Sequence, residues 1–218
     1  MKKTTLVFAA LLIGALAANA DSLVTNRPAG TDSVNWAQLG SPETAIPNPF
    51  SFTTGLGVSG VGTYTYSGGL TMQEGVTWGG NFSFGDYLNW TDGTAGPLTL
   101  SFAQGYSQIG AQIQADYYGP FTAQICDING CFSENGLSDG NGDGSAIYIG
   151  VSSGAPITWA TFSLTSATDG LTNDFAINEV TLNGGSVAAT PEPSSLLLLG
   201  TGLVGFAAAM RRKFARKA

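Results

Sequence analysis

Ile109-Gly110-Ala111-Gln112-Ile113-Gln114-Ala115 decides the fold of this chain, and Phe121-Thr122-Ala123-Gln124-Ile125 repeats its pattern soon afterwards. In both stretches apolar residues occupy every second position, so an extended chain would have one apolar and one polar face. This alternation is typical of a half-buried antiparallel strand. No stretch of ten residues in the region 21–190 shows the 3.6-residue period of an amphipathic helix.

Apolar runs recur through the middle of the chain, separated by turn-forming residues. Residues 21–190 hold 27 glycines, and Thr, Ser, Val, Ile and aromatic residues lie between them. This composition suits short strands and tight turns. Strands are predicted at Val61–Tyr66, Val76–Phe84, Leu98–Phe102, Ile109–Ala115, Phe121–Cys126, Ala146–Val151, Ile157–Leu164 and Phe175–Leu182. Regularly spaced strands predict the all-β class, as an antiparallel β-sandwich or jelly roll.

The last predicted strand changes phase along its length. Phe175 and Ile177 alternate in one phase, and Val180 and Leu182 alternate one position out of step. A β-bulge near Asn178 would explain the change, and burial of both faces is the alternative.

Both ends of the chain carry targeting features. Lys2-Lys3, the apolar run Leu6–Ala18 and the triplet Ala18-Asn19-Ala20 predict a signal peptide that is cleaved after Ala20. Near the other end Pro191-Glu192-Pro193 precedes the uncharged run Leu196–Met210, and five cations follow within the last eight residues. That run is shorter than the roughly 20 residues that cross a bilayer, but flanking serines and snorkelling basic side chains can extend it. A single C-terminal membrane-anchor helix is predicted, with its basic end in the cytoplasm.

The C-terminal arrangement resembles the PEP-CTERM domain of Gram-negative bacteria that make exopolysaccharide. The resemblance implies that Pro191, Glu192 and Pro193 form the sorting motif at which the membrane protease exosortase cuts. Other stretches resemble strand signatures of many PEP-CTERM exoproteins and imply a lectin-like β-sandwich of unassigned activity. These stretches are Ile109–Asp116, Gly119–Ala123, Gly144–Val151 and Asp174–Val180. The expected partners are signal peptidase, exosortase and the inner membrane, and the expected destination is the cell surface or extracellular matrix.

Five segments are predicted along the chain. They are the signal peptide 1–20, a lead-in 21–49, a β-sandwich domain 50–183, a flexible linker 184–190 and the sorting and anchor segment 191–218. The lead-in is polar and contains four prolines, so it is predicted to be extended and ordered only in part. The linker is short and rich in small residues, which favours flexibility.

The region between the targeting segments is strongly acidic. Residues 21–190 hold 14 of the 15 acidic residues and a single cation, Arg27, which gives a charge of about −13. Nucleic acid is bound through Lys and Arg, so it is not an expected partner, whereas divalent cations are attracted. The chain has no histidine, which excludes Ser-His-Asp and Cys-His nucleophiles and histidine zinc sites. No catalytic residue is assigned, and the chain is not expected to be an enzyme.

Cys126 and Cys131 are the only cysteines, and the turn-forming sequence Asp-Ile-Asn-Gly separates them. Paired thiols in exported proteins are usually oxidised, so a disulfide across a hairpin is predicted. A metal site would need two further soft ligands, and a redox site would need C-x-x-C spacing.

Asp139, Asn141 and Asp143 alternate with glycines in the segment 139–144, as oxygen ligands do in the first half of a calcium loop. Gly150 stands where an EF-hand has its bidentate Glu, and a strand is predicted where a helix would follow. Two alternatives remain open, a weak Ca²⁺ site and a solvated hairpin connection. No other cofactor is expected.

Aromatic residues give the last functional indication. Trp90, Tyr117 and Tyr118 lie near turn signals and are candidates for stacking on sugar rings, whereas Trp78 and Trp159 lie inside predicted strands and are expected in the core. Together with the tail, these features favour a surface or matrix protein that binds or organises exopolysaccharide. The alternatives are a structural coat protein without a ligand and a carbohydrate-active enzyme with paired carboxylates.

Overall fold

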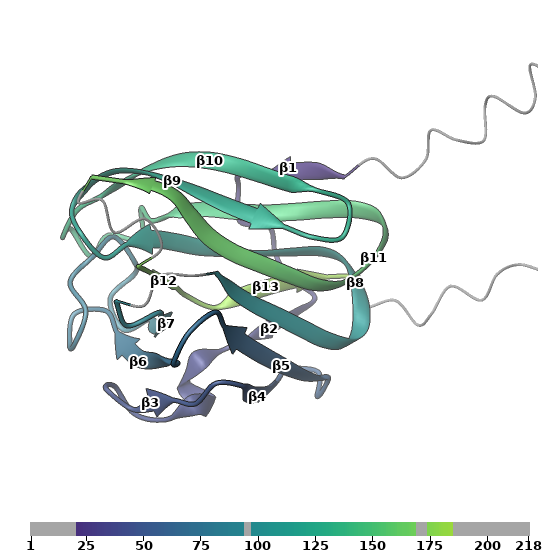
Figure 1. Cartoon of the computed structure of the whole chain (residues 1–218), viewed down its shortest axis with the longest axis horizontal. Helices are drawn as coiled ribbons and strands as arrows, with labels where there is room; N and C mark the ends of the chain where they lie inside the picture. Colours follow the sequence, from purple (N-terminus) through teal and green to yellow (C-terminus); the bar gives the residue numbers. More distant parts are fainter. Residues whose placement is uncertain (1–20, 94–96, 169–173, 185–218) are drawn as a thin grey trace, which may run out of the picture. The chain divides into compact units, whose positions relative to one another are not determined.

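A computed structural model of the chain describes residues 21–93, 97–168 and 174–184. Within these residues the chain forms β-strands and one short 3-10 helix, and every pairing between named strands is antiparallel (Figure 1). The elements are β1 (Ser22–Val24), β2 (Asp32–Val34), η1 (Trp36–Leu39), β3 (Ala45–Ile46), β4 (Phe50–Thr53), β5 (Ser59–Tyr64), β6 (Gly69–Gln73), β7 (Tyr87–Trp90), β8 (Leu98–Ala115), β9 (Gly119–Cys126), β10 (Cys131–Ser138), β11 (Ile147–Ala167), β12 (Phe175–Ile177) and β13 (Val180–Asn183). The predicted all-β class with antiparallel strands is confirmed.

No helix in the described ranges is long and apolar enough to cross a membrane. Several predicted features lie outside the described residues: the signal peptide with Ala18 and Ala20, the motif Pro191–Pro193 and the anchor helix Leu196–Met210.

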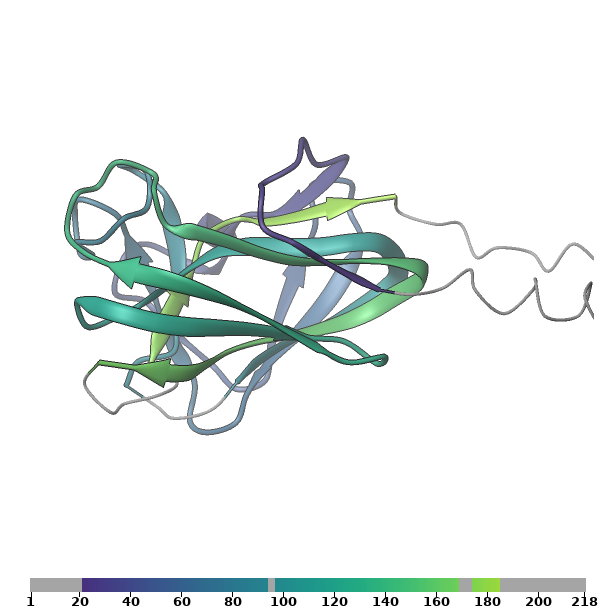
Figure 2. The ribbon, with the colours of Figure 1, turned by 90° about the horizontal axis from the view of Figure 1, so that it is seen from above.

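Strands β8 and β11 are the longest strands of the sheet and connect its parts. They pair with each other along most of their length, and both curve at the same end of the described domain (Figures 1 and 2). Their register shifts between Ser152 and Trp159, and Gly105 lies opposite this irregular stretch. A Cβ atom on Gly105 would stand 2.4 Å from the Cβ of Pro156, so only glycine allows this close approach. Leu98–Phe102 and Ile109–Ala115, predicted as two strands, are therefore parts of one bent strand.

The bend divides the sheet into two halves that share β8 and β11. The first half runs in the order β4, β5, β8, β11, β9 and β10. In the second half β1, β11 and β8 are followed by β12 and β13, with β7, β6 and β3 beyond β12 and β2 beside β13. One apolar core draws buried side chains from both halves.

Residues of the predicted lead-in belong to this core. Val34 and Trp36 are fully buried and Ile46 is buried, and the Trp36 indole N–H donates to the carbonyl of Asn178 at 2.7 Å. The structure thus corrects the expectation of an extended segment over 21–49, because β1, β2, η1 and β3 all join the domain. Each of these elements has only two to four residues, too few for an alternating pattern to be visible.

A smaller apolar cluster lies on the opposite face of β12. Ala176 packs there with Trp78 and Phe82, whereas its neighbours Phe175 and Ile177 point into the main core. Trp78 is therefore a core residue, as expected, while Trp159 is only half-buried.

The predicted strand Val76–Phe84 is wrong. The amides of Val76, Thr77 and Trp78 all donate to the carbonyl of Gln73, which closes a tight turn, and Gly75 adopts a left-handed φ of 76° beside it. Trp78 and Phe82 belong to the smaller cluster as loop residues, whereas Val76 and Phe84 are exposed, so burial in this segment does not reflect strand alternation.

The phase change near Asn178 is a bulge, as predicted. Ile177 pairs with Ile113 and Thr181 with Gly110, so three residues on one strand face two on β8. The side-chain oxygen of Asn178 accepts the amide of Gln112 at 3.1 Å, which replaces a ladder hydrogen bond. Both faces of β12 and β13 are also largely buried, so the two explanations hold together.

Candidate functional site

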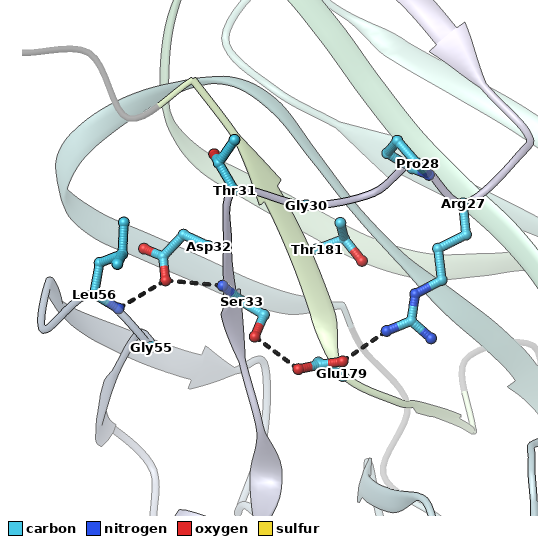
Figure 3. Close-up of a pocket in the computed structure, with 10 residues that line it drawn as sticks. All are labelled: Arg27, Pro28, Gly30, Thr31, Asp32, Ser33, Gly55, Leu56, Glu179 and Thr181. Atoms are coloured by element: carbon cyan, nitrogen blue, oxygen red, sulfur yellow. Dashed lines mark hydrogen bonds and ion pairs between the residues drawn. The ribbon is translucent and has the colours of Figure 1, made fainter.

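An open polar pocket of about 370 Å³ lies beside the paired strands β2 and β13 (Figure 3). The connection from β1 to β2, the β4–β5 loop and the bulge between β12 and β13 each contribute side chains to it. The lining residues are Arg27, Pro28, Gly30, Thr31, Asp32, Ser33, Gly55, Leu56, Glu179 and Thr181. We call it the Arg27–Glu179 pocket.

The ion pair that names the pocket fixes two opposite charges on its wall. Glu179 Oε2 accepts from Arg27 Nη2 at 2.7 Å, and Glu179 Oε1 accepts from the Ser33 hydroxyl at 2.6 Å. The side chains of Arg27 and Glu179 are 39% and 35% exposed. Exposed ion pairs stabilise a fold by only about 0–1 kcal/mol. The pair therefore adds little to the stability of the domain, and it leaves a guanidinium and a carboxylate facing solvent.

Asp32 contributes a second carboxylate that is 7% exposed. Its Oδ1 accepts the amides of Ser33 and Leu56, both at 2.9 Å, and its Oδ2 accepts the Tyr106 hydroxyl at 2.9 Å. Burial acts to raise the pKa of this carboxyl, but hydrogen bonds from Thr54, Leu56 and Tyr106 outweigh it and hold the pKa below its usual value. Asp32 is therefore ionised at neutral pH and ties the β4–β5 loop to β2.

The pocket combines donors, acceptors and apolar surface at close range. Arg27 keeps further N–H groups beyond the one given to Glu179, and carboxylate oxygens have lone pairs to spare. Leu56, which is 71% exposed, presents an apolar side chain at the rim. This combination suits a polyhydroxylated ligand, whose hydroxyls donate and accept while its C–H faces pack on apolar groups.

The three aromatic residues predicted to stack on sugars lie elsewhere, since none lines the Arg27–Glu179 pocket. Trp90 is half-buried: its indole N–H donates to Asp174 at 2.7 Å, and its ring packs edge-on against Trp78. Tyr117 and Tyr118 follow β8 and are 52% and 58% exposed. The Tyr118 hydroxyl donates to the carbonyl of Gly79 at 2.7 Å, so one edge of that ring is engaged.

The candidate calcium residues lie in the loop between β10 and β11. Asp139 accepts hydrogen bonds from the Asn141 side chain at 2.7 Å and from the Asn81 side chain at 2.7 Å. Asp143 accepts the amide of Ser145 at 3.0 Å, and hydrogen bonds from Ser145 lower the pKa of its carboxyl. In the part of the chain that the structure describes, no three acidic or thiol side chains are grouped to hold a metal ion.

Cys126 and Cys131 form a disulfide at the end of the β9–β10 hairpin. The two residues are directly opposite, next to the pair closed by the bond from the Asp127 amide to the Gly130 carbonyl. Their Cα atoms are 4.1 Å apart, just under the usual range of about 4.4–6.8 Å. The hairpin predicted from the cysteine spacing is thus present.

Most residues of the pocket could not be identified from a pattern in the sequence. Arg27 was distinctive as the only cation of an acidic region, but nothing indicated its partner, which lies 152 positions away. Asp32, Ser33 and Leu56 come from short elements without a visible pattern. The solitary cation was the one usable sign, since it is expected beside a carboxylate.

A protein-family model described as the PEP-CTERM protein-sorting motif matches residues 189–213. These residues include Pro191-Glu192-Pro193 and the whole apolar run Leu196–Met210, so the resemblance to exosortase substrates is confirmed. No curated protein matched the chain.

Proposed function

From the PEP-CTERM motif at residues 189–213, we propose that this protein is displayed at the cell surface or in the extracellular matrix, where it binds or organises exopolysaccharide. The motif supports export and C-terminal sorting by exosortase, and it is the observation that carries the proposal. In the proposed course, signal peptidase cuts after Ala20, Leu196–Met210 anchors the chain in the inner membrane, and exosortase cuts near Pro191–Pro193.

The proposal treats the described domain as a β-sandwich or jelly roll, with 184–190 as its linker to the sorting segment 191–218. Support comes from the two halves of the sheet, which share one core and two bent strands. The predicted domain 50–183 is extended to include residues 21–49, since these contribute to the core.

The Arg27–Glu179 pocket is the proposed contact for polysaccharide. An acidic domain repels anionic polymers in general, so a neutral or weakly charged glycan fits the surrounding field best. Within the pocket Arg27 offers donors and Glu179 offers acceptors to paired hydroxyls. The exposed pair Tyr117 and Tyr118 is the second proposed contact, by stacking on sugar rings.

Mass spectrometry of the protein recovered from the cell surface tests the sorting steps. The expected mature chain begins at Asp21 and lacks every peptide from the C-terminal segment after Pro193. A strain without exosortase provides the control, in which the same tail peptides should be present in the membrane fraction. Intact tail peptides on surface protein from the parent strain would overturn the proposed processing.

Calorimetric titration with the organism's own purified exopolysaccharide tests the binding step. Arg27→Gln and Glu179→Gln are each expected to weaken binding about tenfold or more, because hydrogen bonds to charged groups contribute about 1.5–3 kcal/mol. Glu43→Gln removes an exposed carboxylate outside the pocket and should leave the affinity unchanged. If only the double variant Tyr117→Ala with Tyr118→Ala lost affinity, the glycan contact would be assigned to the turn that holds these tyrosines. No binding by the unsubstituted protein would favour the coat-protein alternative.

A further inference from the structure

A buried carboxyl group meets a half-buried one where the described domain begins. Asp127 lies in the turn of the disulfide-bridged β9–β10 hairpin and is 5% exposed. Asp21 directly precedes β1, and its carboxyl group is within hydrogen-bonding reach of that of Asp127. The other neighbours of the pair, Asn129, Gly130 and Ser153, do not titrate.

Each carboxyl group has one satisfied and one unsatisfied oxygen. Asp127 Oδ1 accepts the amides of Asn129 and Gly130 at 2.9 and 3.2 Å, and Asp21 Oδ2 accepts the Asn129 side chain at 2.8 Å. Asp127 Oδ2 and Asp21 Oδ1 are buried atoms to which no donor among the described residues is bonded. Two ionised carboxylates cannot donate to each other, and a buried acceptor without a donor is costly. The pair therefore lacks a proton or a cation.

The pKa values of the two carboxyl groups are shifted in opposite directions. Burial, together with the charge of Asp21, raises the pKa of Asp127. For Asp21, burial acts in the same direction, but hydrogen bonds from Ser153 and Asn129 outweigh it and the pKa is lowered. Without a counter-ion, Asp127 is thus the member that takes up a proton as the pH falls.

The sequence supplies a cation at this position, because Asp21 follows the cleavage triplet Ala18-Asn19-Ala20. Hydrolysis of the Ala20–Asp21 bond by water leaves a carboxylate on Ala20 and frees the Asp21 amine, which takes a proton near neutral pH. An uncharged amide with one N–H thereby becomes an ammonium with three. Only Cα and Cβ separate this nitrogen from the carboxyl carbon, so it lies within about 5 Å of its own carboxylate oxygens in any rotamer.

We propose that signal-peptide removal creates the counter-ion of the Asp21–Asp127 pair, and that the new α-ammonium fastens β1 to the domain. Strand β1 has only three paired positions, all on β11. An ion pair at Asp21, the residue directly before the strand, therefore has a large effect on how firmly β1 is held. The inference rests on one step of the proposed function, cleavage after Ala20. It does not depend on sugar binding or on exosortase.

The test compares two forms of the chain in detergent. One begins at Asp21 and ends at Ala218, prepared from a fusion whose protease leaves no extra residue, and the other retains Ala18-Asn19-Ala20. At pH 7 the form beginning at Asp21 is expected to melt about 2–6 °C higher. Asp127→Asn should abolish the difference, whereas Asp92→Asn, which removes an exposed carboxylate, should preserve it.

The pH dependence has a definite sign. An amine paired with carboxylates has a folded-state pKa above its unfolded value of about 7.7–8.0. Its contribution is therefore complete below that value and is lost as the pH rises through the folded pKa. The difference in Tm between the two forms should vanish in strongly alkaline buffer.

An NMR titration of the Asp21 α-amine gives an independent answer, even if Asp127→Asn fails to fold. The proposal requires an amine pKa above about 8.0 in the chain that begins at Asp21. Equal melting temperatures for the two forms, or an amine pKa within the ordinary range, would overturn it. These results concern the purified chain, so they stay distinct from any failure of sorting or glycan binding in cells.

Discussion

Asp32 and Arg27 show how single polar residues connect distant parts of this protein. Asp32 bonds to its own strand, to the β4–β5 loop and to Tyr106 on β8. Arg27 bonds to Glu179 at the bulge between β12 and β13. The buried carboxylate has the structural role, while the exposed ion pair contributes little to stability and is available to a ligand.

Replacement of Asp32 by Asn is expected to lower the free energy of unfolding by about 1–3 kcal/mol at pH 7, because a charged acceptor of three hydrogen bonds is lost. The folded-state pKa of Asp32 is lowered, so its contribution is present above the unfolded pKa of about 3.9 and is lost as the pH falls through the folded pKa. Urea melts from pH 7 to pH 2.5 should show the gap between wild type and variant closing in acid. A gap independent of pH would show that the charge of Asp32 does not matter.

At the scale of elements, aromatic rings and glycines form the contact between β4 and β5. Phe50 lies opposite Gly62, and Phe52 lies opposite Gly60. A Cβ atom on Gly62 would stand 2.0 Å from the ring of Phe50, and one on Gly60 would stand 2.3 Å from the ring of Phe52. Each glycine thus leaves the space that its cross-strand ring fills.

Gly62→Ala is expected to destabilise the protein by about 1–3 kcal/mol, because Phe50 must leave its packed rotamer. Gly130→Ala is the matched control: its added Cβ would have no atom within 4 Å. That variant should stay within about 1 kcal/mol of wild type. Chemical denaturation of both variants makes the comparison, and equal effects would argue against the steric explanation.

Local patterns predicted those elements whose faces differ in polarity. The alternation in β9 and in the second half of β8 was readable because polar and apolar residues share each strand. The bend at Gly105 was not, since a glycine between two apolar runs looks the same in a turn as in a bent strand. The loop 76–84 was mistaken for a strand because Trp78 and Phe82 are apolar for a different reason, namely that they pack in the smaller cluster.

The candidate site was even less predictable, because it depends on tertiary contacts. The disulfide followed from two cysteines and the turn between them, all within one hairpin. The Arg27–Glu179 pocket needs three segments, 27–33, 55–56 and 179–181, and the pairing of β2 with β13 joins opposite ends of the domain sequence. Trp90 lay near turn signals, yet its indole is engaged by Asp174. No local rule could have foreseen that bond.

For the whole molecule, the dominant property is the charge of about −13 over residues 21–190. Mutual repulsion of this size opposes the compact state, and ions in solution reduce it. A general effect of salt must therefore be separated from a specific effect of Ca²⁺ at Asp139 and Asp143.

Melting temperatures in matched ionic strengths of NaCl and CaCl₂ make this separation. If the loop 139–144 holds Ca²⁺ at about 10⁻⁴–10⁻³ M, millimolar calcium should raise the Tm by more than sodium does. Asp139→Ala with Asp143→Ala should remove that excess. An excess that persists in the double variant would assign it to other carboxylates, and no excess in either protein would leave the loop as an ordinary connection.

Strand β13 gives the domain a mechanical property. It is the last strand of the described residues, and the chain continues from it toward the sorting segment, so tension on an attached C-terminus enters the domain at Asn183. The same strand carries Thr181 in the pocket wall and directly follows Glu179. Pulling β13 from β2 and β8 would first take Leu182 and Val180 out of the core and would then draw Glu179 away from Arg27 and Ser33. If the pocket holds a polymer as proposed, load on the C-terminal side of the domain would therefore weaken that contact.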